Sequence, residues 1–560
     1  MDERDTASRR RVHDALTQRG FTRDWSADRA VYVGTLDPTV LAVPVRIDVT
    51  DLDFISAPPI YLGEEYRVTG RRLPHLLGET RSLCYYAKGS VVLDRYDPGG
   101  TVLQCLEQAD IVLRKAVRGS SDIDFAHEFQ AYWSSLFVLV DLPANSTGVV
   151  KVRYLNLRAG DEPTGVICTR GSWLVEAHLA NRSSLPPGED CVVISTVAAL
   201  SVNPNADWPP ENLRDLNAWL GWIDPSLVGI LEKSFSTGGH PTRWVAIRAA
   251  NGTFILSATL PPTLRTDEFQ KSRRAKLPSI IARIPEKIPI QRTLGLPADV
   301  DYIFSRNMGN MANLGGKRIL LIGAGTIGGF LAHQLAQSGA GAIDGRLTIV
   351  DKDELRTANL GRHLLGIPHI NRNKAHGCCD FIKQQLPMLT VDSYSGDALD
   401  LLTASSIPYD LIIDATGEEA FSLAVNERSV RHRETWPPVL FGYLVGNGAM
   451  AQALFTGESG RACLKCLKPR LSGPSRFPTM RAGVEVTTAE NMECADPRYI
   501  PYPVTRSVVA AALICETALA WARGSIGHRF RSHLFDPSQA LSVKDGNPAV
   551  SRNCPACSPT

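Results

Sequence analysis

The feature that most constrains the fold is a glycine-rich motif between a buried apolar run and a helical pattern. Residues 318–323 read RILLIG, which is typical of a buried parallel strand, and Gly323-Ala-Gly325-Thr-Ile-Gly328 completes the motif. A helical pattern then extends to about Ser338. The glycines let backbone N–H groups approach an anion, and the helix N-terminus favours negative charge. The motif predicts a nucleotide phosphate site, although NAD, FAD and ATP proteins share it and a glycine turn without a ligand is the alternative.

The pattern around this motif predicts a doubly wound sheet. From about Tyr302 onward, strand and helix patterns alternate, which favours a mostly parallel α/β arrangement. The next strand, 347–350, ends at Asp351, where a ribose hydroxyl is usually held. Residues 409–414 read YDLIID, so Asp414 ends a strand at the carboxyl edge of the sheet. An acid there is a natural Mg²⁺ ligand beside nucleotide phosphates, and a strand-capping aspartate is the alternative.

Two cations follow the second strand and favour a triphosphate. Asn359-Leu-Gly-Arg362 comes first, and Lys374 begins a helical pattern that runs to about Gln385. A lysine in the first turn opposes the helix dipole, a conflict that an anionic ligand would relieve. Arginine grips oxygens in a fork and lysine acts as a point charge. If only one of the two cations were present, an ordinary solvated surface charge would be the alternative to a phosphate contact. A dehydrogenase, which would bind NAD tightly, fits this set poorly.

The 12 cysteines fall into three groups. Two CxxC pairs supply the ligand set of a closed structural zinc site, with free or redox-active thiols as the alternative: Cys463, Cys466, Cys554 and Cys557. Six others lie in helical or strand-like stretches and are expected to be inert core residues: Cys105, Cys168, Cys191, Cys378, Cys379 and Cys515. The last two, Cys84 and Cys494, lie in loop-like contexts.

Cys494 has the surroundings of a nucleophile. It lies in a polar, proline-rich loop near Arg498 and before a helical pattern that begins near Thr505. A nearby cation and a helix N-terminus both lower a thiol pKa and favour the thiolate. A thiol without a role in a surface loop is the alternative.

The order of SRN at 305–307, GAGTIG, VDKDELRTANLGRH at 350–363, Lys374 and DATG at 414–417 resembles the ThiF/ubiquitin-activating superfamily over residues 302–560. The resemblance implies that a C-terminal carboxylate attacks the α-phosphate of ATP and pyrophosphate leaves. It further implies a thioester cysteine at Cys494 and a homodimer in which Arg306 reaches the partner's site. The sequence departs from the family at His363, where many members have Gln. This difference is expected to adjust the activity without changing the class of reaction. The implied roles are ribose for Asp351, phosphates for Arg362 and Lys374, nucleotide contact for Asn359 and the glycines, and Mg²⁺ for Asp414.

A second region, about 25–145, resembles ubiquitin-conjugating enzymes. His75 lies nine residues before Cys84 with a glycine turn between them, and Tyr96-Asp-Pro leads into a helical pattern at 101–116. The usual His-Pro-Asn reads His-Leu-Leu, so the asparagine credited with stabilising the oxyanion is absent and its replacement is open. The alternative is a half-buried strand-end cysteine and a surface histidine.

A conjugating-like region ahead of an activating region is similar to fused proteins of bacterial CBASS anti-phage operons. This resemblance implies that the C-terminus of a cGAS-like nucleotidyltransferase is adenylated, captured by Cys494, passed to Cys84 and delivered to an amine, with lysine as the expected acceptor. Two alternatives stay open. In the first, a ThiF-like adenylyltransferase serves a sulfur-carrier protein and Cys84 has no role. In the second, the chain is a non-catalytic nucleotide-binding scaffold.

The expected organisation has three parts. Residues 1–148 form an α+β conjugating-like domain, 149–300 a mixed α+β linker domain and 301–560 a Rossmann-like adenylation domain with the zinc site. The linker has no catalytic pattern and is expected to be a scaffold that spaces the two thiols or docks the partner, with a proline-rich connector at 277–297. A helix is expected at 6–22, ended by Gly20, and another at 101–116 with Thr101 as N-cap.

Charge and the lengths of apolar runs limit the kinds of partner that the chain is expected to bind. The formal net charge of +2 gives no support to a nucleic-acid surface. The first eleven residues are strongly charged, so no signal peptide is expected there. No apolar run is expected to reach the ~18 residues that span a bilayer. Composition therefore predicts a cytoplasmic protein that binds neither nucleic acid nor membrane. The resemblance to CBASS proteins implies a bacterial source, and the motifs predict ATP, Mg²⁺ and Zn²⁺ as cofactors.

Overall fold

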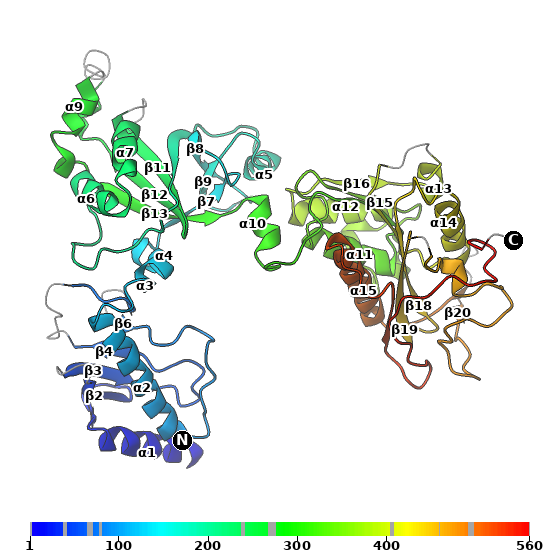
Figure 1. Cartoon of the computed structure of the whole chain (residues 1–560), viewed down its shortest axis with the longest axis horizontal. Helices are drawn as coiled ribbons and strands as arrows, with labels where there is room; N and C mark the ends of the chain where they lie inside the picture. Colours follow the sequence, from blue (N-terminus) through cyan, green and yellow to red (C-terminus); the bar gives the residue numbers. More distant parts are fainter. Residues whose placement is uncertain are drawn as a thin grey trace. The chain divides into compact units, whose positions relative to one another are not determined.

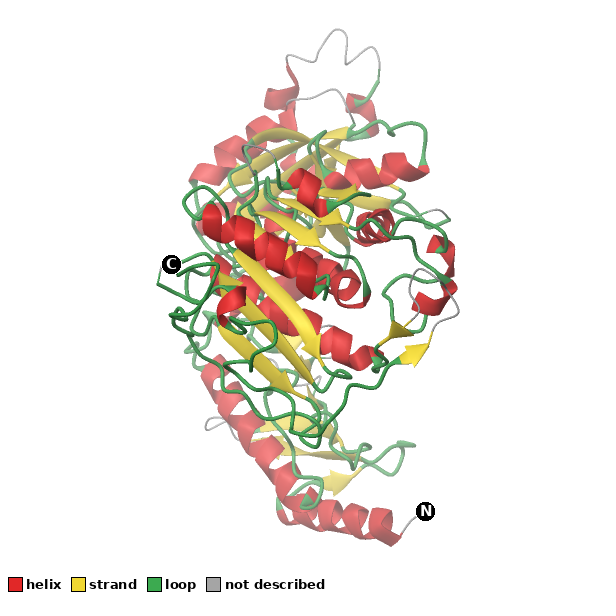
Figure 2. Ribbon diagram, turned by 90° about the vertical axis from the view of Figure 1, so that its right-hand side faces the viewer, coloured by secondary structure: helices red, strands yellow, loops and turns green. Residues whose placement is uncertain are grey.

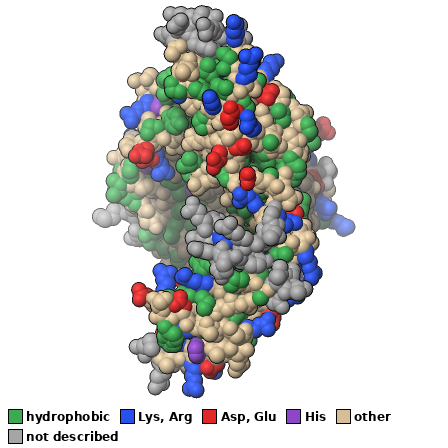
Figure 3. Space-filling model, turned by 90° about the vertical axis from the view of Figure 1, so that its left-hand side faces the viewer, with side chains coloured by type: hydrophobic (Ala, Val, Ile, Leu, Met, Phe, Trp, Pro, Cys, Tyr) green, Lys and Arg blue, Asp and Glu red, His purple; other side chains and the backbone are tan. Residues whose placement is uncertain are grey.

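The computed structural model describes residues 3–36, 42–63, 71–77, 81–158, 160–236, 241–266, 276–403, 408–458, 460–490 and 498–558. The chain divides into two compact units, Met1–Pro297 and Ala298–Thr560 (Figure 1). On the face in Figure 3, basic and acidic side chains are interspersed, in keeping with the near-zero net charge.

The first unit begins with an antiparallel sheet packed against two helices. Helix α1 (Glu3–Gln18) packs on α2 (Pro98–Val117), and Val12 and Leu16 of α1 are buried in the shared core. Gly20 follows α1 with φ of +86°, as expected for a residue that ends a helix. The sheet has the order β1-β2-β3-β4-β6-β5, with strands β1 (Thr22–Arg23), β2 (Val31–Leu36), β3 (Val43–Asp48), β4 (Ile60–Leu62), β5 (Leu76–Leu77) and β6 (Ser82–Leu83).

The rest of the first unit is a closed barrel with helices around it. The barrel has the order β10-β11-β12-β13-β7-β9-β8. Strand β7 belongs to it although it precedes residue 149, where the linker domain was predicted to start; the three-part division stays a prediction. The elements are α3 (Asp124–His127), α4 (Phe129–Trp133), β7 (Phe137–Asp141), β8 (Gly148–Leu155), β9 (Thr164–Cys168), α5 (Trp173–Asn181), β10 (Glu189–Ser195), α6 (Leu213–Ile223), α7 (Ser226–Ser236), β11 (Thr242–Ala249), β12 (Gly252–Thr259), α9 (Leu277–Ile281) and β13 (Ile290–Pro297).

Two local predictions in this unit are wrong. The N-cap of α2 is Asp97, whose side chain accepts from the N–H of Gly100; Thr101 lies inside the helix because the chain already turns at Pro98. The proline-rich run 277–297 is not a simple connector. It contains α9, and β13 pairs with both β12 and β7 because its β-branched and apolar residues complete the barrel.

The second unit, which is nearest the viewer in Figure 2, contains the predicted doubly wound sheet. Its strand order is β16-β15-β14-β17-β18-β19-β22. The first five strands are parallel, and β19 pairs antiparallel with β18 on one side and with β22 on the other. The elements are α10 (Val300–Ser305), β14 (Arg318–Ile322), α11 (Thr326–Gln337), β15 (Arg346–Val350), α12 (Lys374–Gln385), β16 (Val391–Tyr394), α13 (Ala398–Leu401), β17 (Leu411–Asp414), α14 (Glu419–Arg431), β18 (Val439–Val445), β19 (Met450–Thr456), β20 (Ala489–Glu490), β21 (Arg498–Tyr499), α15 (Val504–Ala522) and β22 (Phe530–Leu534).

Helices cover both faces of this sheet. Along β14, Ile319 and Leu321 face the core shared with α11, α12 and α15, while Leu320 and Ile322 face α13 and α14. This alternation is the period of two expected for a strand, and burial on both faces explains the continuous apolar run. The carboxyl ends of β14, β15 and β17 therefore meet at one edge.

Helix α15 was not anticipated as a long apolar segment. By length and composition it could span a membrane, contrary to the expectation of no such run. It packs against α11, β18 and β19, and Ala510, Ile514 and Ala518 are fully or nearly fully buried. These contacts are those of a core helix.

Candidate nucleotide and thiol sites

The glycine-rich loop joins β14 to α11, as predicted. Gly323 has φ of +89°, a region that glycine adopts without strain. A Cβ at Gly328 would lie 1.8 Å from the carbonyl oxygen of Gly323, so a larger residue does not fit. Gly325 is the N-cap of α11 and supplies no side-chain hydrogen bond, so the first N–H groups of the helix are left for an anion.

Both backbone groups of Ala324, inside this loop, form hydrogen bonds with side chains. Its N–H donates to Oδ2 of Asp351 at 2.7 Å, and Nε2 of His363 donates to its carbonyl oxygen at 2.7 Å. The N–H of Leu365 donates to Nδ1 of His363 at 3.0 Å, so the proton of the neutral imidazole is on Nε2. Burial lowers the pKa of His363, and burial raises the pKa of Asp351. The two side chains together fix the phosphate loop.

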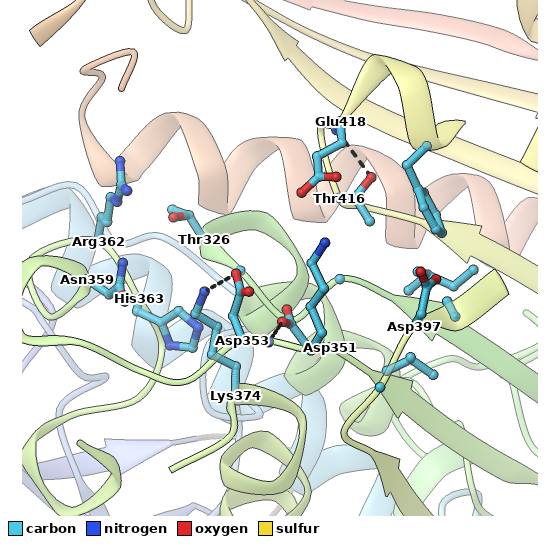
Figure 4. A pocket seen from close by; sticks show the side chains of 18 residues that line it. Thr326, Asp351, Asp353, Asn359, Arg362, His363, Lys374, Asp397, Thr416 and Glu418 are labelled. Carbon is cyan, nitrogen blue, oxygen red and sulfur yellow. Dashed lines mark hydrogen bonds and ion pairs between the residues drawn. The ribbon is translucent and has the colours of Figure 1, made fainter. Parts of the chain in front are cut away.

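Two cations face the cleft beside this loop (Figure 4). Nζ of Lys374, the first residue of α12, lies 3.0 Å from Oδ2 of Asp353. The guanidinium of Arg362 lies 5.6 Å from the ring centroid of Tyr499. Within the described residues, Nε of Arg362 is buried without a hydrogen-bond partner. A buried donor without a partner is costly, so an anion whose oxygens accept from it would fit this position.

These groups line one open cleft. Of the residues predicted to contact the nucleotide, six line it: Gly323, Gly325, Asp351, Asn359, Arg362 and Lys374. Sequence reasoning missed Asp353, which follows Asp351 in the same motif and could have been found there, as well as Thr416 and Glu418, which also line the cleft.

Asp414 and Arg306 lie outside the lining of the cleft. Asp414 is 2% exposed, and it accepts from the N–H of Thr416 at 3.0 Å, the hydroxyl of Thr416 at 2.7 Å and the hydroxyl of Ser422 at 2.6 Å. Burial raises the pKa of Asp414. Arg306 is the exposed C-cap of α10. A magnesium ligand at position 414 would have to exchange one of these hydroxyl bonds for the ion.

The two CxxC pairs converge. Cys463 lies 3.8 Å from Cys466 and 3.7 Å from Cys554, and Cys466 lies 3.2 Å from Cys557, measured between sulfur atoms. All four sulfur atoms lie within 4.8 Å of one another. A tetrahedral ion with metal–sulfur bonds of about 2.3 Å separates its sulfur ligands by about 3.8 Å, so this set fits a metal ion. The hydrogen bond from Cys463 lowers the pKa of Cys466, which favours the thiolate that a metal needs.

The second thiol, Cys84, directly follows β6 and is half-buried. Its N–H donates to the carbonyl oxygen of His75 at 2.8 Å. Burial and, after it, the negative charge of Glu128 raise the pKa of the Cys84 thiol. Cys84 is therefore a thiol at rest, and the six other cysteines expected in the core are buried.

His75 is not the surface histidine of the alternative interpretation. Its side chain is 16% exposed and lies between two carboxylates, with Nε2 2.9 Å from Oδ2 of Asp124 and Nδ1 3.0 Å from Oε1 of Glu128. The hydrogen bond to Glu128 raises the pKa of His75. The hydroxyl of Tyr132 accepts from the N–H of His75 at 2.9 Å. No sequence signal pointed to these partners, because they lie far along the chain from His75.

Cys494, the other predicted thioester cysteine, lies outside the described residues. The side chain of Arg498 is also not described, so the proposed influence on the thiol stays a prediction. Helix α15 begins at Val504, close to the predicted start near Thr505.

Comparison with known proteins decides the family. Residues 303–538 match the ThiF family, and residues 14–138 match prokaryotic E2 family B. The chain is 30% identical to the ATP-dependent ubiquitin transferase-like protein Cap2 of Pseudomonas aeruginosa, over 98% of both chains. The chain belongs to the Cap2 family. Cap2 proteins of Escherichia coli and Vibrio cholerae are each 26% identical to it, over 92% and 96% of this chain and 91% and 92% of their own.

Membership of the Cap2 family confirms both sequence resemblances. The chain is an ATP-dependent ubiquitin transferase-like enzyme with an E2-like N-terminal region and a ThiF C-terminal region. This argues against the scaffold and dehydrogenase alternatives. Among solved structures, E. coli MccB covers 44% of this chain and 66% of its own at 18% identity, with a TM-score of 0.33, a likeness too low to support an argument.

Proposed function

We propose that this Cap2 homologue adenylates the C-terminal carboxylate of a protein partner and transfers that partner, by way of two thioesters, to an amine. A carboxylate oxygen attacks the α-phosphate of ATP and pyrophosphate leaves. The thiolate of Cys494 then attacks the acyl carbon and AMP leaves. Cys84 takes the acyl group from Cys494, and an amine, with lysine the expected acceptor, takes it from Cys84. Exchange of an acyl group between two thiols is nearly isoenergetic. ATP cleavage therefore drives the series of reactions, and the positioning of the thiols sets the rate of the later steps.

The observation that carries this proposal is the composition of the cleft. One cavity gathers an uncapped helix N-terminus, Lys374 and an Arg362 whose Nε is buried without a partner among the described residues. These three features suit the charge of a triphosphate, and a nucleoside without phosphates would leave them unsatisfied. The half-buried Cys84 in an E2-like region supports the second part of the sequence.

The finer assignments follow from the same sites. Asp351 would hold the ribose, Asp414 at the end of β17 would hold Mg²⁺ after exchanging a hydroxyl bond, and the four clustered cysteines would hold Zn²⁺. Bound Mg²⁺ would neutralise charge on the phosphates. Arg306, exposed and outside its own cleft, would reach the site of a second subunit. We further propose a cGAS-like nucleotidyltransferase as partner, a role in anti-phage defence and a cytoplasmic location.

The test is a non-reducing gel with MgATP and the nucleotidyltransferase from the same operon. Wild type, Cys84→Ala and Cys494→Ala are compared, with Lys374→Ala as a variant that cannot load and Lys383→Ala as a matched control. Lys383 lies on the same helix as Lys374 but is exposed and outside the cleft. We expect a thiol-sensitive adduct in wild type, an adduct only at Cys494 in Cys84→Ala, and none in Cys494→Ala.

The other outcomes separate the steps. If ATP–pyrophosphate exchange persists but no adduct forms in any variant, the protein stops at adenylation and the sulfur-carrier alternative replaces the relay. Normal ATP–pyrophosphate exchange in Lys374→Ala would show that the cleft is not the site of adenylation.

A further inference from the structure

We infer that Glu128 is the base that accepts the proton of the acceptor amine when the acyl group leaves Cys84. This inference rests on the proposed thioester at Cys84. It assigns a proton acceptor to the E2-like region, a role separate from that of the oxyanion-stabilising asparagine that the His-Leu-Leu sequence lacks.

Glu128 and Cys84 contact the same residue from two sides. The carbonyl oxygen of His75 accepts from the N–H of Cys84 at 2.8 Å, and the ring of His75 bonds Oε1 of Glu128 at 3.0 Å. The charge of Glu128 acts on the thiol, since it contributes to raising the pKa of Cys84. The carboxylate therefore lies within electrostatic reach of the sulfur that would carry the acyl group.

One oxygen of Glu128 is left for a substrate. Oε1 is engaged by His75, whereas Oε2 is buried without a hydrogen-bond partner of normal geometry among the described residues. The hydroxyl of Tyr132 lies near the same carboxylate. A buried carboxylate oxygen without a donor is unfavourable, and an arriving ammonium would satisfy it. Two carboxylates, those of Asp124 and Glu128, face the single imidazole of His75, and the exposed His127 lies 3.4 Å from Asp124.

The barrel explains why this carboxylate is held so firmly. Phe125, Phe129 and Trp133, spaced four residues apart, pack in the aromatic core of the barrel part. Trp133 also donates from Nε1 to the carbonyl oxygen of Thr293 on β13 at 3.0 Å. The neighbouring face of the same helical turns carries Asp124, Glu128 and Tyr132, the three residues that bond His75. One face anchors the segment and the other presents the carboxylate.

The chemistry balances with groups that the proposed reaction supplies. Oε2 of Glu128 takes one proton from the ammonium, and the freed nitrogen lone pair attacks the thioester carbon. A C–N bond forms and the C–S bond breaks. The leaving sulfur takes the second proton from nitrogen and becomes the Cys84 thiol, while Glu128 releases its proton to solvent. General base catalysis of this kind typically contributes about 10²–10⁴-fold in rate.

The competing explanation is that Glu128 only holds the turn at His75, which has φ of +64°. The titratable groups of the cluster around Glu128 are His75, Asp124, His127, Tyr132 and Cys84, and a neutral substitution at Glu128 would act on them as well. The test must therefore separate proton transfer from positioning.

The experiment loads Cys84 without ATP. Full-length protein carrying Cys494→Ala is acylated with a fluorescent peptide whose C-terminal glycine is a mercaptoethanesulfonate thioester, and Cys84→Ala on the same background defines the signal. Discharge of the purified thioester is timed with lysine and with hydroxylamine, which is already neutral at about pH 7. The variants are Glu128→Gln, Glu128→Asp and, as matched control, Glu107→Gln on the exposed face of α2.

For Glu128→Gln we expect discharge to lysine at about pH 7 to fall on the order of 10²-fold, while loading and discharge to hydroxylamine change less than about twofold. The defect should shrink toward about pH 9, because more free amine is present as the pH approaches the lysine pKa of about 10.4. Glu128→Asp should retain part of the rate, and Glu107→Gln should match the parent.

Three results would overturn the inference. Equal losses with lysine and hydroxylamine would assign Glu128 to positioning alone. Unchanged discharge to lysine in Glu128→Gln would remove it from the reaction while leaving the proposed function intact. Acylation that does not depend on Cys84 would overturn the second thioester itself, and the inference with it.

Discussion

At the scale of single residues, the feature that stands out is His363. It occupies a position where the sequence departs from many ThiF relatives, and the structure gives it a definite role. Its Nε2 proton holds the carbonyl of Ala324, while the N–H of Leu365 holds its Nδ1. Only a side chain with a donor and an acceptor at suitable positions can do both. A glutamine amide has the same pair of groups.

We expect His363→Ala to weaken ATP use and His363→Gln to restore most of it. The alanine leaves the carbonyl of Ala324 and the N–H of Leu365 buried without partners, which costs about 1–3 kcal/mol each in folding stability. Because the phosphate loop is then no longer fixed, we expect kcat/KM for ATP to fall about tenfold or more. ATP–pyrophosphate exchange measures it. Equal activity in wild type and His363→Ala would contradict the clamp.

The same residue should make stability depend on pH. Burial lowers the pKa of His363 below its ordinary value of about 6.5, so the unfolded chain binds the proton more readily than the folded one. The contribution of the neutral imidazole is complete above about pH 6.5 and is lost as the pH falls below that value. Urea unfolding of wild type and His363→Gln should therefore diverge between about pH 8 and about pH 5, with the wild type the more pH-sensitive. Parallel curves would contradict this.

At the scale of elements, the cysteine hooks tie distant segments together. Cys463 and Cys466 flank a short helical turn after β19, and Cys554 and Cys557 lie near the end of the chain. Asn426 on α14 donates from Nδ2 to the sulfur of Cys463 at 3.7 Å, so the cluster also reaches the helix beside the cleft. A metal here would hold the last described residues against the sheet.

We expect the purified protein to contain about one Zn²⁺ per chain and to lose stability when it is removed. Binding of structural zinc contributes on the order of 10 kcal/mol in small zinc-dependent folds, so chelation should lower Tm markedly. Cys557→Ser should reduce metal content, while Cys191→Ser, at a buried cysteine of the barrel outside the cluster, should leave it unchanged. Metal analysis and thermal melts decide it, and a metal-free protein with an unchanged Tm would contradict a structural metal.

At the scale of the whole molecule, two units contribute different parts of the proposed reaction. The ThiF unit carries the cleft, and the first unit carries Cys84 with the barrel behind its helical segment. The aromatic core of the barrel part anchors the residues that bond His75, a contact that the sequence did not indicate. Arg306, exposed on α10, is the group that would connect two molecules.

If Arg306 acts in a second subunit, two inactive variants should complement each other. We expect Arg306→Ala and Lys374→Ala each to lack ATP–pyrophosphate exchange, and their mixture, after subunit exchange, to recover up to about a quarter of wild-type activity, because random pairing gives one intact site in half of the dimers. Mixing Lys374→Ala with Asp351→Ala is the control, since both residues line the same cleft. No recovery would place Arg306 outside the site or within its own subunit.

Much of the nucleotide site could be predicted because its parts are local. A strand, a glycine turn and a helix are specified by neighbouring residues, and parallel strands bring Asp351 and the glycine loop to one edge by geometry alone. The CxxC hooks are similar, since each is a local unit and a shared metal is the common use of two such pairs. The helix beginning at Lys374 followed from the same local rules.

What the sequence by itself determined, then, was the phosphate loop, the order of strands and helices around it and the paired thiolates. Only the tertiary structure decided that Asp414 lies beneath the cleft lining, that residues 290–297 close a barrel, and that Asp124 and Glu128 meet His75. The physical reason is sequence separation. Local backbone preferences act over a few residues, whereas these contacts form only after long loops are closed by burial of apolar surface, and no short pattern records which distant surfaces will meet.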